Sequence, residues 1–317
     1  MSRNATKDLT TGSPMKLILG FGIPLLFGML FQQFYNMMDT IIVGKFLGVS
    51  ALASVGATGS INFMIIGFCM GVCNGFAIPV AQRFGAKDEH GMRKFVANSV
   101  WLSIIFAVVM AVLVCVFCRQ ILELMNTPED IIDGSYSYIF VIFLGIPATY
   151  MYNLLSGIMR SLGDSKTPLY LLIFSSILNI ILDLLSIIVL KMGVAGAAWA
   201  TVIAQAVSGF CCLGVIWKKF PILHVQREEW QPDKLCILNL CNMGIPMGLQ
   251  YSITAIGSVI IQAAVNSLGS VAVASVAAAV KINMFLCCPY DAMGSTMATY
   301  AGQNVGAGKF DRLKQGA

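Results

Sequence analysis

The stretch AQRFGAK, residues 81–87, follows a long apolar segment and returns near the end of the chain as GQNVGAGK, residues 302–309. The two copies are offset by 221 residues. Chance similarity between apolar segments would not keep one register over several matches, so we infer an internal repeat whose second copy is incomplete. Two further pairs of segments share nearly the same offset: GIP at 22–24 and 244–246, and VSALASV at 49–55 with VAVASV at 271–276.

The composition places most of the chain in a membrane. Of 317 residues, 57% are hydrophobic and only 11% are charged, and the mean hydropathy is +0.80. A soluble domain carries roughly twice that charged fraction, so a cytosolic enzyme, a disulfide-stapled secreted domain and a nucleic-acid-binding protein are excluded. Eight stretches reach the length of about 20 residues that crosses a bilayer: 15–43, 50–81, 95–117, 133–158, 168–190, 193–217, 237–266 and 271–301.

The basic residues predict the orientation of these spans. If each predicted span crosses the membrane once, every second connecting segment lies on the same side. Sixteen of the 20 Lys and Arg residues fall in the segments of one side, with Arg160 assigned to the loop after the fourth span. Because loops rich in Lys and Arg stay in the cytoplasm, we expect a multi-pass protein of the cell membrane with a cytoplasmic N-terminus.

The repeat and the spans together predict the architecture. A unit of six spans is even, so its two copies point the same way through the membrane, as in many secondary transporters. We expect an all-α polytopic protein of two lobes, 1–221 with six helices and 222–317 with two, so that about eight of twelve helices are present. A cleft that lacks part of one lobe cannot open to the two sides of the membrane in turn. The chain alone is therefore expected to be inactive unless it assembles with another copy.

Polar side chains follow one face of four spans, by their i, i+3/4, i+7 spacing. Charge within a span costs roughly 2.5–3.5 kcal/mol, so the carboxylates need a reason. If these faces converge, they form an oxygen-rich chamber; the alternative for the amides and hydroxyls is interhelical hydrogen bonding alone. The residues, span by span, are Gln32, Asn36 and Asp39; Tyr150 and Asn153; Asn179 and Asp183; Thr201 and Gln205.

Such a chamber suits a coupling ion. Two carboxylates in a low-dielectric site can share a proton, and the same oxygens can bind Na⁺, a hard cation. Since the only histidines, His90 and His224, fall in loops, we expect no other metal and no cofactor. Lys281 and Asp291 are further charges within a span; Lys281 either faces a substrate path or reaches the interface.

The motifs of the chain resemble those of the MATE family of multidrug and toxin extrusion transporters. The resemblance rests on segments spread over nearly the whole chain: GIP at 22–24, QQFYNMMDT at 32–40, AQRFGA at 81–86, RSLGDSKTP at 160–168, GVAGAAWAT at 193–201 and GQNVGAG at 302–308. It implies twelve helices in two six-helix lobes, and export of organic cations and other xenobiotics driven by inward flow of H⁺ or Na⁺.

The resemblance also implies roles for individual residues. In the DinF-like branch of the family, the positions matched by Asp39, Asn153, Asn179, Asp183 and Thr201 bind the coupling cation. The remaining polar residues, Gln32, Asn36, Tyr150, Gln205, Lys281 and Asp291, are candidates for the substrate path. We expect the first helix to rearrange around Pro24. The NorM-like branch has an acid where this chain has Thr254, which argues against a NorM-type second cation site.

Two other functions fit the sequence less well than export. A lipid-linked-oligosaccharide flippase of the same superfamily needs a more basic cleft than the one intramembrane Lys281 predicts. An intramembrane aspartyl protease would use paired Asp motifs, but Tyr290-Asp291 and Leu162-Gly163-Asp164 occur in reversed order and Asp164 falls in a loop. We therefore expect a transporter and not an enzyme. Its expected partners are the lipid bilayer and small xenobiotics, with no nucleic acid and no obligate protein partner.

Overall fold

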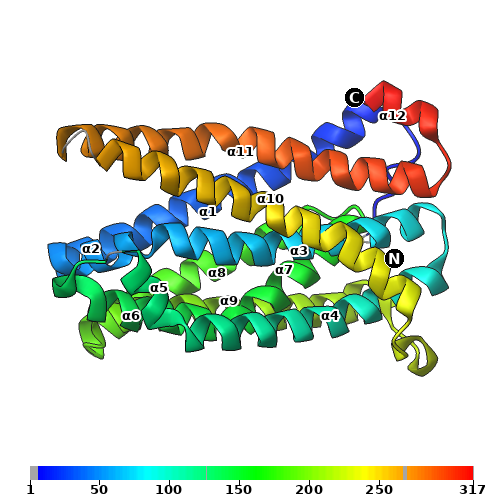
Figure 1. Ribbon diagram of the computed structural model, residues 1–317. Helices are drawn as coiled ribbons and strands as arrows, with labels where there is room; N and C mark the ends of the chain where they lie inside the picture. The colour runs from blue at the N-terminus through cyan, green and yellow to red at the C-terminus, as the bar shows by residue number, and fades with distance from the viewer. Residues whose placement is uncertain (1–5, 126, 267–269, 317) are drawn as a thin grey trace.

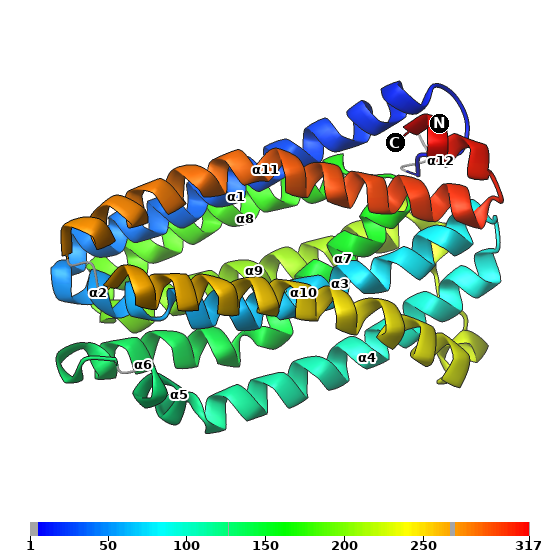
Figure 2. The same ribbon diagram turned by 45° about the horizontal axis from the view of Figure 1, so that its top comes forward.

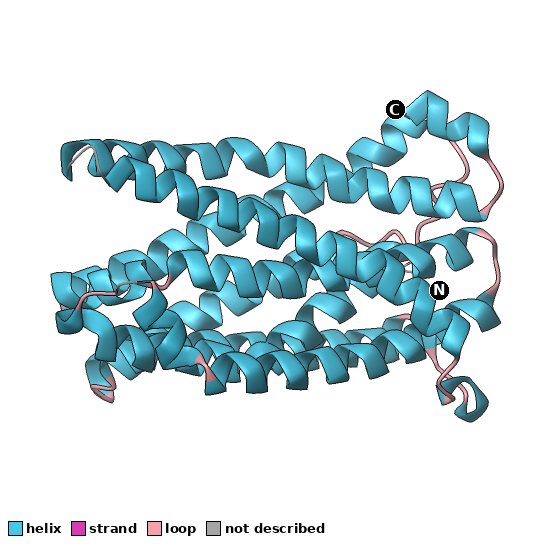
Figure 3. Cartoon of the chain, in the orientation of Figure 1, coloured by secondary structure: helices cyan, strands magenta, loops and turns pink. Residues whose placement is uncertain are grey.

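The computed structural model describes residues 6–125, 127–266 and 270–316, and the side chains of these residues except 259 and 262–282. Every regular element in this part of the chain is helical, as Figure 3 shows. The helices are α1 (Pro14–Leu47), α2 (Val49–Ala57), α3 (Gly59–Gly85), α4 (Glu89–Val116), α5 (Cys118–Leu124), α6 (Glu129–Leu144), α7 (Ile146–Ser161), α8 (Lys166–Leu184), η1 (Leu185–Val189), α9 (Gly193–Lys219), η2 (Pro221–Leu223), η3 (Arg227–Trp230), α10 (Lys234–Asn266), α11 (Ser270–Gly306) and α12 (Phe310–Gly316).

The polytopic all-α prediction is confirmed, with corrections to the spans. Within the described residues, five helices are long and apolar enough to cross a membrane, or six if the bent pair α6 and α7 forms one span. The last two predicted spans correspond to α10 and α11, of 33 and 37 residues.

Three predicted spans are not single α-helices. The span 50–81 divides at Thr58, where the side chain donates to Val55 O at 2.7 Å and a new helix begins. The span 133–158 bends by 46° at Gly145, because Pro147 at the second position of α7 cannot continue an α-helical hydrogen-bond ladder. The span 168–190 ends in a π-turn, η1.

Residues in equivalent places of the two repeat copies contact each other reciprocally. Gly85 of α3 lies against the backbone of Gln303, while Gly306 of α11 lies against the backbone of Gln82. Gln82 and Gly85 are each 221 residues before their counterparts. Only glycine allows the two helix backbones to approach this closely. Such exchange of contacts is what a pseudo-two-fold axis between the copies produces; the division at residue 221 itself stays a prediction.

The same relation holds for the pairing of whole helices. α10 packs along α3 and α11 packs along α1, as Figures 1 and 2 show from two sides. Gly75 lies against Gly244 in the first pair, and Gly22 lies against the Thr296 side chain in the second. These contacts lie in the half of the bundle nearer the two chain termini.

The N-terminal segment closes that end of the bundle. Leu9 is fully buried; its N–H donates to Gln303 Oε1 at 2.9 Å and its carbonyl accepts from Asn304 Nδ2 at 3.3 Å. Lys309 Nζ donates to Thr10 O at 2.8 Å, and Lys7 N donates to Leu162 O at 2.9 Å. Residues 7–12 with Gln303, Asn304, Lys309 and Arg312 are called the terminal seam below, because they join α7–α8 to α11–α12.

Candidate functional site

Two buried carboxyl groups face each other between α1 and α8. Asp39 is buried on α1, and Asp183 on α8 is 0% exposed. The two carboxyl groups lie near enough for the charge of each to act on the other. Asn179 lies one turn before Asp183 on α8 and is also buried. The i, i+4 spacing therefore places both α8 side chains on the face that meets α1.

Thr201 of α9 joins the third helix to this group. Its Oγ1 accepts from Asn179 Nδ2 at 3.2 Å, lies 3.3 Å from the Tyr35 hydroxyl, and donates to Ala197 O at 3.1 Å. Tyr138 of α6 lies near both carboxyl groups and Tyr35. We call Tyr35, Asp39, Tyr138, Asn179, Asp183 and Thr201 the chamber. Its helices α1, α8 and α9 pack against one another.

Several chamber oxygens are buried without a hydrogen-bond partner among the described residues. They are Asp39 Oδ1, Asn179 Oδ1 and both oxygens of Asp183, and Gln205 Oε1, one turn after Thr201, shares this property. Nearly all buried polar atoms of folded proteins are paired, so a cluster of unpaired oxygens needs an explanation. Carboxyl, amide and hydroxyl oxygens together suit a proton or a hard cation such as Na⁺.

The other residues of the predicted site lie at different places. Asn153 donates to Thr149 O of its own helix at 2.8 Å. Tyr150 is buried toward α3, where Cys73 Sγ lies 3.9 Å from its carbonyl oxygen. Asn36 and Asp291 are exposed, and Gln32 is half-buried. The side chain of Lys281 lies outside the described residues.

Pro24 lies inside α1, which continues unbroken from Pro14 to Leu47. The residue is partly buried, between Gly22, which contacts Thr296 of α11, and Leu25, a member of the small core between α1 and α11. A proline at this place removes one helical hydrogen bond and lowers the cost of bending α1 there.

Comparison with known proteins places this arrangement in a family. The sequence model of the MatE family matches residues 24–185 and 246–317. The chain belongs to the MatE family. It is 32% identical over 305 residues to the probable multidrug resistance protein YoeA and 30% identical over 308 residues to the probable multidrug resistance protein YpnP, both of Bacillus subtilis (strain 168).

The solved structures agree with the sequence comparison. The fold matches the outward-facing conformation of a multidrug resistance MATE family transporter of the MOP superfamily with a TM-score of 0.91 and 25% identity, over 100% of this chain and 70% of that one. The alignments include 93% of this chain with 65% of YoeA and 96% with 68% of YpnP. The chain thus spans about two thirds of the length of these relatives.

In this MatE chain, the positive charge of Arg160 lies at a different place from the one that the sequence predicted. α7 continues to Ser161, so Arg160 is a helix residue and not the loop residue that the charge pattern assigned. Its Nη2 donates to Asn74 Oδ1 of α3 at 3.1 Å. A signal was available, because Asn153, Gly157 and Arg160 follow i, i+4, i+7 spacing.

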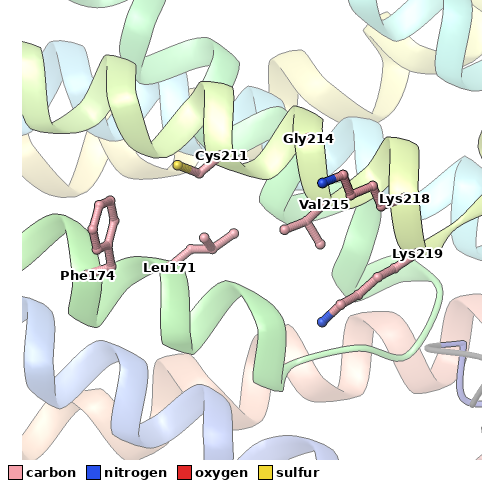
Figure 4. A pocket seen from close by; sticks show the side chains of 7 residues that line it. All are labelled: Leu171, Phe174, Cys211, Gly214, Val215, Lys218 and Lys219. Carbon is pink, nitrogen blue, oxygen red and sulfur yellow. The ribbon is translucent and has the colours of Figure 1, made fainter.

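A groove opens between α8 and α9, shown in Figure 4. Leu171 and Phe174 line it from α8, and Cys211, Gly214 and Val215 from α9, with Lys218 and Lys219 at one end. It lies nearer the start of α8 than Asn179, and none of the described chamber residues lines it. The groove of this MatE protein is therefore separate from the carboxyl pair.

Proposed function

We propose that this chain carries the ion-coupling machinery of a secondary-active exporter, which exchanges organic and often cationic compounds for H⁺ or Na⁺ across the cell membrane. The observation that carries the proposal is the buried Asp39–Asp183 pair, three of whose four oxygens lack a hydrogen-bond partner among the described residues although they lie among amide, hydroxyl and phenol groups. Two neighbouring carboxyl groups in a buried site disfavour each other's charge, so the pair favours the uptake of a proton or a cation.

The coupling follows from this charge balance. With the bundle closed near its termini, Asp39 and Asp183 take up H⁺ or Na⁺ from the outer side, and the loss of negative charge changes the packing of α1 on α8 and α9. Because α1 also contacts α11 through Gly22 and Thr296, bending at Pro24 transmits that change to the other lobe. The lobes then rock, the substrate leaves outward and the ion leaves inward. In this orientation the N-terminus lies in the cytoplasm.

Ethidium efflux from energised cells tests the proposal. The chain is expressed alone and joined to the last third of YpnP, each as wild type, Asp39→Asn and Asp183→Asn. Asp130→Asn, an exposed carboxylate at the start of α6, is the matched control. We expect each chamber variant to lose at least about tenfold in efflux rate, as for removal of a group essential to coupling, and the control to keep it.

Two outcomes would refute the exporter. One is a wild-type efflux rate in Asp183→Asn at matched expression, and the other is no efflux from the joined chain although it reaches the membrane. Repeating the assay with a protonophore and in Na⁺-free medium identifies the coupling ion, because only loss of the driving gradient stops export.

A further inference from the structure

The groove between α8 and α9 begins where the close packing of these two helices ends. Nearer the chamber, Ser175 Oγ donates to Ala204 O at 3.2 Å. One turn further along α9, Ser208 Oγ donates to Leu171 O, also at 3.2 Å. Helical spacing predicts which later α9 residues continue this face toward α8. Those residues line the groove instead, and they are Cys211, Val215 and Lys218.

The interior of the groove is apolar and has open space. Leu171 and Val215 are half-buried, and Phe174 is exposed. A side chain at Gly214 would meet no atom within 4 Å, so this glycine leaves the α9 wall open. The groove has a volume of about 420 Å³, within the range of ligand sites. Lipid chains surround a membrane protein at this depth, so a hydrocarbon chain is the ligand that suits this interior.

Two positive charges lie at one end of the groove. Lys218 and Lys219 are exposed, and Figure 4 shows both side chains extending from the end of α9 toward the groove. Within the described part of the chain, the ion pairs all involve other basic groups, namely Arg83, His90, Arg93 and Arg119. Neither lysine therefore pairs with a described carboxylate, and an anion at this end of the groove would complement both charges.

Trp217 indicates the depth of these charges in the membrane. It is exposed and stacks on His224, with 4.5 Å between the ring centroids. Tryptophan is enriched at the level of the lipid headgroups, and the two lysines follow it directly. The terminal seam lies at the same end of the bundle, because Asp8 and Ile222 line one small pocket. In the orientation proposed above, the lysines thus face the inner leaflet.

We propose that the groove binds one anionic phospholipid. An acyl chain lies along Leu171, Phe174 and Gly214, and the phosphate contacts Lys218 and Lys219. An ammonium group binds a phosphate as a point charge, and basic pockets between membrane helices bind anionic headgroups. The site differs from ordinary contact with bulk lipid because it needs both the lysine pair and the open groove. It takes up a lipid, not an exported compound, and it does not depend on the Asp39–Asp183 pair.

Native mass spectrometry of the purified chain in detergent tests the site by counting bound lipids. Dioleoyl-phosphatidylglycerol and dioleoyl-phosphatidylcholine share their chains and differ in headgroup charge. Glycerol phosphate has the anion without the chains. In wild type we expect one phosphatidylglycerol to bind at least about tenfold more tightly than phosphatidylcholine. Glycerol phosphate should not displace it.

The charge is tested by a double variant with a matched control. Lys218→Gln combined with Lys219→Gln should weaken phosphatidylglycerol binding about 25-fold, or about fivefold for each lysine. Phosphatidylcholine binding should change less than about twofold, because its headgroup is neutral overall. Lys234→Gln combined with Lys314→Gln removes the same charge from exposed positions of α10 and α12. This control should keep the wild-type affinity.

The groove is tested by a variant that keeps both lysines. Gly214→Leu fills the open space, and leucine favours a helix more than glycine does, so the chain should fold and melt as wild type does. Phosphatidylglycerol should bind about tenfold more weakly, as for lost burial of about two methylene groups. Gly257→Leu of α10, where a side chain also meets no atom within 4 Å, is the control and should leave the affinity unchanged.

Four outcomes overturn the proposal. Equal loss in the two double lysine variants means that the lysines act only through the overall charge. Unchanged affinity in Gly214→Leu means that the groove holds no chain. Equal binding of the two lipids to wild type means ordinary contact with bulk lipid, and displacement by glycerol phosphate assigns the lysines to a free phosphate. No arm measures efflux, so the lipid site and the exporter can fail independently.

Discussion

The terminal seam and the chamber are both buried polar clusters, but they differ in how their polar atoms are satisfied. In the seam, Gln303 is 0% exposed, accepts from Leu9 N at 2.9 Å and donates to Ser161 O at 2.8 Å. Asn304 donates to Tyr300 O at 2.8 Å and accepts from Arg312 Nε at 3.1 Å. In the chamber, both oxygens of Asp183 lack a partner among the described residues.

Under the proposed function, the difference separates a cluster that stabilises the fold from a cluster that binds the coupling ion. A buried polar atom left unpaired costs about 1–3 kcal/mol. The paired atoms of the seam avoid this cost and stabilise the closed bundle, whereas the unpaired oxygens of the chamber destabilise it. A site that must bind and release an ion cannot have its oxygens satisfied by the protein alone. We therefore expect substitutions in the chamber to reduce transport, and substitutions in the seam to reduce stability.

The largest expected effect comes from Asp183→Asn. Transport should fall at least about tenfold, while the free energy of unfolding should stay the same or rise by about 1 kcal/mol, because a neutral amide is less costly to bury than a carboxylate. Efflux and the melting temperature of the purified chain are measured on one preparation. A fall of several degrees in melting temperature would place Asp183 with the seam and remove the contrast.

The next effect is in the seam. Gln303→Leu leaves Leu9 N and Ser161 O without their side-chain partner, and we expect it to lower the free energy of unfolding by about 3 kcal/mol, the cost of two orphaned buried groups. Trypsin should then cleave the N-terminal segment, at Lys7, faster than in wild type. Gln315→Leu, at an exposed site of α12, is the control. An unchanged melting temperature in Gln303→Leu would contradict the structural role of the seam.

A third test moves to the connector between α9 and α10, which is as fully paired as the seam. Glu229 of η3 is 1% exposed and accepts from Arg93 Nε at 2.9 Å and from Gln226 N at 2.8 Å, with His90 Nδ1 also 2.8 Å away. Burial by itself would raise the pKa of Glu229, but these hydrogen bonds outweigh it and hold the pKa below the ordinary value.

The sign of the pH dependence follows from that lowered pKa. A carboxyl group whose pKa is lower in the folded state stabilises the fold above its unfolded pKa, and this stabilisation is lost as pH falls through the folded pKa. Glu229→Gln should therefore cost about 2 kcal/mol at pH 7 and less below pH 4. Melting curves from pH 3 to 8 measure the difference. A cost that does not shrink in acid would show that the Glu229 charge has no part in it.

The sequence predicts much of the chamber and little of the seam. Asp39, Asn179, Asp183 and Thr201 were identified because a carboxylate in an apolar helix is conspicuous and i, i+4 spacing fixes its face. Tyr35, four residues before Asp39, follows the same rule but was missed because a tyrosine is ordinary in a membrane helix.

The bends and the seam depend on contacts that no local pattern encodes. Thr58 ends α2 inside an apolar run that reads as one span. Gln303 and Asn304 were recognised as a repeated motif, but their partner Leu9 lies 294 residues from Gln303 along the chain. Arg160 was assigned to a loop because its position at the end of α7 hid the direction of its side chain.

The smallest expected effect comes from a comparison of Asn179→Ala with Asn153→Ala, which tests which of the two asparagines belongs to the chamber. Asn179 donates to Thr201, and its Oδ1 has no partner among the described residues, whereas Asn153 donates to its own helix. Thermal stabilisation of the purified chain by Na⁺, or by protons in its absence, reports the ion affinity. We expect Asn179→Ala to weaken the ion affinity by about 1 kcal/mol, the contribution of one hydrogen bond. Asn153→Ala should change the affinity by less than half of that. Equal losses would mean that Asn153 reaches the ion in a conformation other than this one, and the chamber would then extend to α7, as the family resemblance predicts.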